Sequence, residues 1–177
     1  MLNVISGLLS GGAAAATNSY ESIATVLVTS NQSSIDFTSI PQTFKHLQIR
    51  ALTTCSSAAS GTIIQFNGDT GANYKSHAVY GSGAGTGVLV STPLYSPNFM
   101  GGAKTTSPGA AIVDILDYTN TNKNTTTRSL DGYDANGSGY IGLSSGLWMN
   151  TAAVTSIKMS FTNITDGASF ALYGIKG

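Results

Sequence analysis

The chain has 177 residues, which is enough for one folded domain with a sizeable core and too few for two ordinary domains. Charged residues make up only 9% of the sequence, and eight acidic and eight basic side chains give a formal net charge of zero. The basic residues are scattered singly, so no basic stripe could neutralise a row of phosphates, and nucleic-acid binding is not expected.

Residues 1–19 are predicted to form an apolar N-terminal attachment arm. The side chains expected to bind a partner subunit are Leu2, Val4, Ile5, Leu8 and Leu9. The Gly and Ala residues at 11–16 would serve as a flexible connection to the domain. The apolar stretch is too short to span a bilayer and no Lys or Arg precedes it, which argues against a membrane partner and a secretory signal. A cleaved leader or a simple first strand is the alternative.

From residue 20 to residue 177 the sequence predicts a single all-β domain. It is rich in Thr and in β-branched and aromatic residues, and no window of eleven or more residues keeps an apolar helical period. Gly, Asn and Asp clusters break the chain about every ten residues, as in a sandwich or barrel. The predicted strands cover residues 23–28, 34–37, 47–51, 62–66, 77–80, 87–90, 110–118, 126–133, 140–143, 156–162 and 170–175.

These strands predict two packed antiparallel sheets, an antiparallel jelly-roll-like β-sandwich with one or two additional edge strands. Residues 23–28 are apolar on both faces and are expected to be covered on both. Ile157, Met159 and Phe161 alternate with polar residues, which is typical of a strand with one buried face. Residues 92–109 contain three of the four prolines and predict a long exposed excursion. The apolar C-terminus, residues 170–177, predicts a fixed final strand.

One segment resembles a calcium-binding loop. Asp134, Asn136 and Ser138 have the spacing of the first three oxygen ligands, and Gly139 occupies the position of the bend. The position of the bidentate Glu is occupied by Ser145, however, and the flanking segments are predicted strands. A β-hairpin turn explains the same residues, since Asn-Gly is a strong hairpin signal. We therefore expect no metal site and no cofactor.

No catalytic site is predicted. Asp114 and Asp117 are three residues apart, which places them on opposite faces of a strand, so a shared acid–base role is not expected. His46 and His77 have no metal-ligand or triad spacing, and the single Cys55 is interpreted as a small apolar side chain. The chain is expected not to be an enzyme.

Aromatic side chains near predicted strand ends leave two interpretations open. They are Tyr74, Tyr80, Tyr95, Phe99, Tyr118, Tyr133, Tyr140 and Trp148. Exposed Tyr or Trp beside Asn and Asp can stack on sugar rings, which would allow binding of a host surface glycan. Packing in the core or in a subunit interface is the alternative and is favoured. Trp148, in an apolar stretch, is expected to be buried.

Several motifs, taken in order, resemble a family of small virion proteins of phages that infect aquatic bacteria. The motifs are YESIATV from residue 20, then IPQTFKHLQIR, FNGDTGANY, SHAVYG, DILDYTNTNK, RSLDGYDANGSG, GLWMNTAAVTSI and the terminal SFALYGIKG. The resemblance covers about residues 20–177. It implies a particle-associated β domain and carries over no catalytic residue. Capsid decoration, head fibre and tail fibre all remain open.

Together these observations predict a structural component of a bacteriophage particle, located in the virion. Residues 20–177 would form the jelly-roll β-sandwich domain, and the arm would anchor it to capsid or tail proteins. A homo-oligomer is expected, with a trimer favoured, because a low-charge β domain can bury its open edges by cyclic association. The alternatives are a tail-fibre receptor-binding tip and a secreted carbohydrate-binding module.

Overall fold

The computed structural model describes residues 19–56, 61–91, 99–100 and 107–177, and all regular secondary structure in these ranges is β-strand. The all-β class predicted from the composition is therefore confirmed. The strands are β1 (Tyr20–Leu27), β2 (Gln32–Phe37), β3 (His46–Thr53), β4 (Gly61–Phe66), β5 (Tyr74–Ser82), β6 (Gly85–Ser91), β7 (Phe99–Met100), β8 (Gly109–Leu116), β9 (Thr125–Asp134), β10 (Gly139–Trp148), β11 (Ile157–Ile164) and β12 (Ser169–Ile175).

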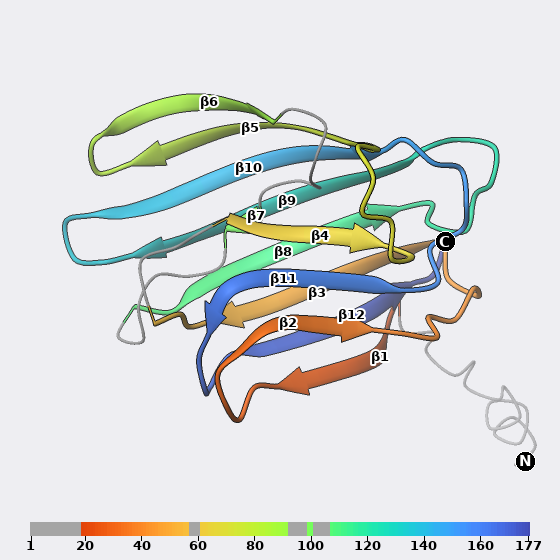
Figure 1. Ribbon diagram of the computed structural model, residues 1–177, viewed down its shortest axis with the longest axis horizontal. Coiled ribbons are helices and arrows are strands. Elements are labelled where there is room, and N and C mark those ends of the chain that lie inside the picture. Colours follow the sequence, from red (N-terminus) through yellow and green to blue (C-terminus); the bar gives the residue numbers. More distant parts are fainter. Residues whose placement is uncertain (1–18, 57–60, 92–98, 101–106) are drawn as a thin grey trace, which may run out of the picture.

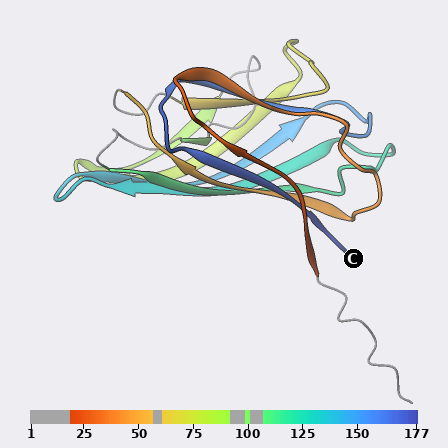
Figure 2. The ribbon, with the colours of Figure 1, turned by 90° about the horizontal axis from the view of Figure 1, so that it is seen from below.

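The strands form two antiparallel sheets that pack as a sandwich. The larger sheet has eight strands in the order β1-β12-β3-β8-β9-β10-β5-β6, and the smaller has four in the order β2-β11-β4-β7. In Figure 1 the smaller sheet lies in front of the larger one, and Figure 2 shows the two layers from the side. The predicted sandwich of two antiparallel sheets is thus present.

The hydrophobic core lies between the two sheets. Alternate residues of each strand point inward, as the period of two requires. Ile157 and Met159 of β11 are almost fully buried and Phe161 is 7% exposed, which confirms the strand with one buried face that the sequence predicts. The largest side chains that are almost fully buried are Trp148, Tyr74, Tyr118, Phe66 and Phe170. The burial predicted for Trp148 is therefore confirmed.

The final strand is fixed, as predicted, because β12 lies between β1 and β3 and pairs with both along its length. The prediction for residues 23–28 is wrong. Residues 23–27 belong to β1, which is an edge strand, and Leu27 is 64% exposed while Thr25 is also exposed. Apolar residues on both faces of a strand therefore do not indicate here that both faces are covered.

Two hairpins extend the larger sheet beyond β8. β5 and β6 form one hairpin and β9 and β10 form the other, and together they make the half of the sheet that follows β8. We call these four strands the wing. In Figure 1 the wing forms the upper part of the molecule, and its two hairpin turns project to the left.

Strand ends differ from the prediction where local geometry intervenes. β8 ends at Leu116, two residues earlier than expected, because Asp117 adopts a positive φ of 48° and its carbonyl accepts a turn hydrogen bond of 2.9 Å from the Asn120 amide. β10 continues to Trp148, five residues further than expected. Within the predicted excursion at 92–109, the short strand β7 pairs with β4, and residues 92–98 and 101–106 lie outside the described ranges.

Cys55 is buried near the end of the smaller sheet, where its backbone bridges to Ile164. Burial raises the pKa of its thiol. The thiol is therefore protonated at neutral pH and chemically quiet, consistent with its interpretation as a small apolar side chain.

Candidate association surface

The polar residues of the sequence motifs are mostly engaged in holding the sandwich together. Asn67, in a tight turn with φ of 52°, donates its side-chain amide to the Ala153 carbonyl at 2.8 Å. Its side-chain oxygen accepts from the backbone amides of Thr155 and Ser156 at 2.8 and 3.1 Å. The motif FNGDTGANY is thereby bonded to the motif GLWMNTAAVTSI, far along the chain.

The Asp69 carboxylate, two residues further on, accepts hydrogen bonds from three directions. They come from the indole Nε1 of Trp148 at 2.7 Å, the side-chain amide of Asn73 at 2.9 Å and the backbone amide of Gly71 at 2.9 Å. The indole bond makes the largest contribution to lowering the pKa of the Asp69 carboxyl. Because all of these donors stabilise the ionised form, Asp69 is a structural anion and not a proton donor at neutral pH.

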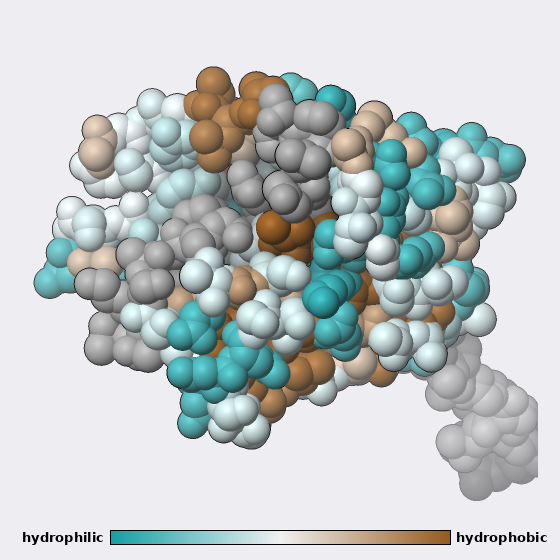
Figure 3. Space-filling view, viewed as in Figure 1, coloured by the Kyte–Doolittle hydropathy of each residue, from teal (hydrophilic) through white to brown (hydrophobic). Residues whose placement is uncertain are grey.

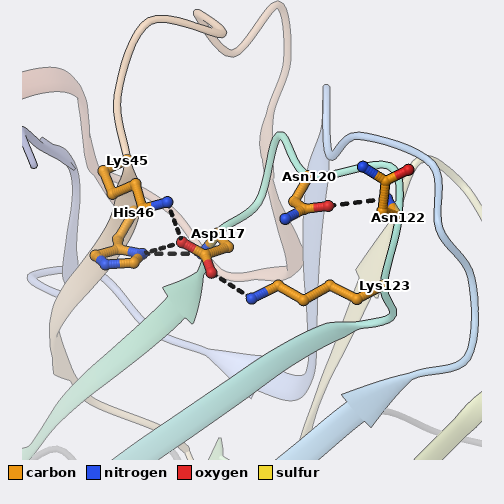
Figure 4. A network of polar contacts seen from close by, with 6 residues as sticks. All are labelled: Lys45, His46, Asp117, Asn120, Asn122 and Lys123. Atoms are coloured by element: carbon orange, nitrogen blue, oxygen red, sulfur yellow. Dashed lines mark hydrogen bonds and ion pairs between the residues drawn. The ribbon is translucent and has the colours of Figure 1, made fainter.

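A second polar network surrounds Asp117 at the opposite end of β8 from Gly109. Lys45 lies 3.0 Å from the carboxylate and Lys123 binds its other oxygen. The backbone amide of Asp117 donates to Nδ1 of His46 at 2.9 Å. Figure 4 shows the carboxylate held between Lys45 and His46 on one side and Lys123 on the other. The two lysines lower the pKa of Asp117 to about 2.

Asp114 and Asp117 bind different partners, so they form no carboxylate pair. Asp114 accepts from Gln48 at 2.8 Å and from Arg128 at 3.1 Å, on the outer face of the larger sheet. Asp117 lies beyond the strand end in the network of Lys45 and Lys123. No cluster of three or more His, Cys, Asp or Glu side chains that could hold a metal ion occurs among the described residues.

The segment that resembles a calcium loop forms a hairpin. Asn136 and Gly137 both have positive φ, 54° and 97°, and the Ala135 amide bonds to the Ser138 carbonyl at 2.8 Å. These are the features of a two-residue hairpin turn between β9 and β10. The Asp134 carboxylate accepts from the Asn136 amide at 2.8 Å and thereby stabilises the turn.

The aromatic residues divide into two groups. Tyr74 and Trp148 pack with Phe66 in the core, with ring centroids 5.5 to 6.5 Å apart, and Tyr118 is also buried. Tyr80, Tyr133 and Tyr140 are half-buried near the hairpin turns of the wing. Tyr95 and the side chain of Phe99 lie outside what the structure describes.

The alternation of polar and apolar residues is reversed in the wing. In β9 the inward side chains are polar, and Thr127, Ser129 and Asp131 are at most 3% exposed. Leu130, between two of them, points outward and is 51% exposed. Leu143 of β10 is likewise 49% exposed while its neighbour Ser144 is buried. The outer face of the wing is therefore the more apolar of its two faces.

A continuous apolar patch results on the outer side of the larger sheet, which we call the outer apolar face. Twelve large hydrophobic side chains are exposed in the described part of the chain, and eight of them belong to this patch. They are Leu52, Val79, Val88, Val90, Ile112, Leu130, Ile141 and Leu143. In contrast, the side of the molecule that carries β2 and β11 is mostly hydrophilic or neutral, with smaller hydrophobic areas along β6, in the middle of the view and near its lower edge (Figure 3).

The strand register places the middle of this patch in one straight row. Ile112 pairs with Leu130, Leu130 with Leu143, Leu143 with Val79 and Val79 with Val88, across five adjacent strands. These side chains are 43% to 72% exposed. Isolated exposed hydrophobic residues are common on protein surfaces, whereas a row of this length is a mark of an interaction site.

The neighbouring row contains a protrusion between two hollows. Ile141, 61% exposed, pairs with Gly132 on one side and Gly81 on the other. Because neither glycine has a side chain, one hollow lies over Gly132 and is lined by Ile112 and Leu130, and a second lies over Gly81. This relief allows a complementary protein surface to pack closely.

Two charged groups at the border of the patch have partners within the chain: Arg50 pairs with Ile112 at one end of the row, and Asp114 lies in the next row. Arg50 donates to the Gln48 side-chain oxygen at 2.8 Å, and its guanidinium lies 5.1 and 4.9 Å from the ring centres of Tyr20 and Tyr173. Asp114 is bound by Gln48 and Arg128. An apolar partner could therefore cover the patch without leaving either group without a partner from its own chain.

Sequence reasoning did not find this surface. Leu130 lies between the polar residues Ser129 and Asp131. In a strand that alternates in this way, the leucine is ordinarily assigned to the buried face. The available signal was the small or polar character of every second residue in β10, with Gly142, Ser144 and Gly146 on the buried side.

The arm residues Leu2, Val4, Ile5, Leu8 and Leu9 lie outside the described residues, so the attachment role expected of them stays a prediction. The described part of the chain contains no helix of the length and hydropathy required to span a bilayer. Comparison with known proteins found no matching protein family, no matching curated protein and no matching solved structure.

Proposed function

We propose that the chain is a non-enzymatic structural subunit of a bacteriophage particle, a capsid decoration or appendage protein whose work is to bind other protein surfaces. The observation that carries this proposal is the outer apolar face. A row of five hydrophobic side chains over five strands is costly to leave in water, and it is accounted for if a protein covers it in the assembled state.

The described carboxylates support a role that involves no catalysis. Asp69, Asp114 and Asp117 are each held by hydrogen bonds or ion pairs from the same chain. A carboxyl group that acts as a general acid works best with a pKa near the operating pH, whereas the pKa values of Asp69 and Asp117 are lowered. These three carboxylates accordingly serve folding.

We also assign the sandwich to the jelly-roll type. Setting the wing aside, the larger sheet has the order β1-β12-β3-β8 and the smaller one β2-β11-β4-β7. Consecutive strands of this reduced chain lie in opposite sheets, except β4 and β7, which are neighbours in the smaller sheet, and this is the order of a jelly roll. Jelly rolls occur in capsid and lectin domains, so this assignment is compatible with a virion role by analogy and does not itself carry the function.

The experiment is a binding assay with purified particles from the source of this sequence. The full chain is expected to bind them, and a chain lacking residues 1–12 is expected to remain folded and lose binding. A control variant keeps the length and replaces Leu2, Val4, Ile5, Leu8 and Leu9 with Ser, and it is expected to behave like the truncation. Retained binding by either variant would refute the anchor role. Absence of the full chain from an electron-microscopy map of the particle would refute the virion role.

A receptor-binding tip is the second candidate, favoured by the tyrosines of the wing. Tyr80 and Tyr140 stack with centroids 5.6 Å apart and planes 13° apart, and a hollow between the two hairpin turns is lined by Tyr133, Asp134 and Ser138 among others. Aromatic rings beside polar groups suit the stacking of sugars. Glycan-array binding that is lost in Tyr140→Ala and retained in Tyr20→Ala would support this candidate, and no binding by the wild type would dismiss it.

A further inference from the structure

We propose that the outer apolar face is covered by a second copy of this chain, so that the wing is the self-association element of the protein. This inference deepens the proposed function, because it names the partner of the surface on which that function rests. Three properties of the face lead to a copy of the chain as the occupant.

The first property is its extent. Six adjacent strands, β3, β8, β9, β10, β5 and β6, carry the face. With strands ~4.8 Å apart and about seven residues of ~3.4 Å each, they cover roughly 600 Å². A stable protein interface of the smaller standard kind buries about 600 Å² on each partner. The face is therefore of the size that one further globular subunit would cover, and larger than a single short peptide strand requires.

The second property is its shape. The face is the broad side of a sheet, and broad sheet surfaces pack against one another at about 10 Å with their side chains interdigitating. Ile141 stands between the hollows over Gly132 and Gly81. A surface that carries both a protrusion and adjacent hollows of matching apolar chemistry can complement itself, which interfaces between identical subunits require.

The third property is its charge. Arg50 and Asp114 are satisfied within the chain, and the remaining formal charges of the whole molecule balance to zero. A face of one sign would repel an identical face and point to a partner of opposite charge. Here no such repulsion arises, and a low net charge favours association of identical molecules.

The test is the mass of the full-length purified protein in solution, measured by sedimentation velocity and light scattering over a range of concentrations. Wild type is expected to be a multimer. Leu143→Glu, at the centre of the row, is expected to raise the dissociation constant by about a hundredfold and to give monomers, because association would bury a new, unpaired carboxylate. Val88→Glu, at the end of the row, is expected to weaken association in the same direction.

The matched control is Leu89→Glu. Leu89 follows Val88 in β6, is also exposed at 40%, and points to the other side of the sheet. This variant is expected to keep the wild-type mass. Circular dichroism checks that all three variants keep their fold, as expected for sites that are 40% to 72% exposed.

A multimer of two or of three copies that Leu143→Glu dissociates supports the proposal, since the proposal concerns the surface and not the number of copies. A monomeric wild type, or a multimer that Leu143→Glu leaves intact, would overturn it. A multimer that is lost only on deletion of residues 1–18 would overturn it in favour of the arm. None of these measurements involves the particle, so failure here and failure of the virion role are distinguishable.

Discussion

The indole nitrogen of Trp148 donates a 2.7 Å hydrogen bond to the carboxylate of Asp69, joining the end of β10 to the turn after β4. The two residues are 79 positions apart in the chain. Around them, Tyr74 packs against the indole and donates its hydroxyl to the Asp69 carbonyl at 3.0 Å. One carboxylate thus fixes the position of the only tryptophan of the protein.

Replacing Asp69 with Ala should destabilise the fold by about 3 kcal/mol, because the buried indole N–H loses its charged acceptor. Chemical denaturation followed by the fluorescence of Trp148 measures the change and reports on the site itself. Asp36→Ala is the control, since Asp36 is exposed on β2. Equal losses in the two variants would contradict the anchoring role of Asp69.

The hydroxyl of Tyr74 should make the protein sensitive to alkali. Burial is the largest cause that raises the pKa of Tyr74 to about 12, and the hydroxyl also accepts from the Phe66 amide at 3.1 Å. The neutral phenol is favoured in the folded state, so its contribution is complete below the ordinary tyrosine pKa of about 10 and is lost as the pH rises to about 12.

Tyr74→Phe should therefore unfold less steeply with pH between about 10 and 12, while its stability at neutral pH falls by about 1–3 kcal/mol from the unpaired Phe66 amide. Thermal melts across this pH range measure both effects. Tyr20→Phe, at an exposed tyrosine, is the comparison and should change neither. An unchanged alkaline profile in Tyr74→Phe would refute the assignment.

Acid should weaken the network around Asp117. Its pKa is lowered to about 2, so the ionised form is favoured in the folded state, and the resulting stability is present above the ordinary Asp pKa of about 4. This stability is lost as the pH falls from about 4 to about 2. Asp117→Asn should flatten that part of the pH dependence of the melting temperature. If the melting temperature of Asp117→Asn still falls steeply with acid, the loss of stability must come from other carboxylates.

Two glycines should respond oppositely to the same substitution. A Cβ at Gly174 of β12 would overlap the ring of Phe44, so Gly174→Ala should destabilise by about 1–3 kcal/mol through overpacking. A Cβ at Gly81 of β5 would meet only Ile141, at an ordinary 3.5 Å, so Gly81→Ala should leave the stability within about 0.5 kcal/mol. Urea titrations measure the stability of both variants. Similar losses of stability in the two would contradict the packing described at Gly174.

The sequence predicted best where one local signal dominates. The alternation around Ile157, Met159 and Phe161 predicted the buried face of β11, and the Asn136-Gly137 pair predicted the hairpin between β9 and β10. Both signals depend only on neighbouring residues. The class of the fold and the fixed final strand followed from similar patterns.

What depends on position within the sheet could not be predicted. The edge location of β1 and the outward direction of Leu130 are set by which strands lie beside them and over them, and the residues of β1 and β9 do not themselves encode this. The anchoring of Asp69 by Trp148 depends on a contact across 79 residues. A single sequence without aligned relatives carries no signal for such a pair.

Each hairpin of the wing interrupts a connection between sandwich strands, β5 and β6 between β4 and β7, and β9 and β10 between β8 and β11. Most of the hydrophobic packing between the two layers comes from the other eight strands. Mutation can therefore change the exposed row while the hydrophobic core of the molecule stays intact. Because the exposed row and the core lie largely on different strands, the same fold can acquire new binding specificities and still fold.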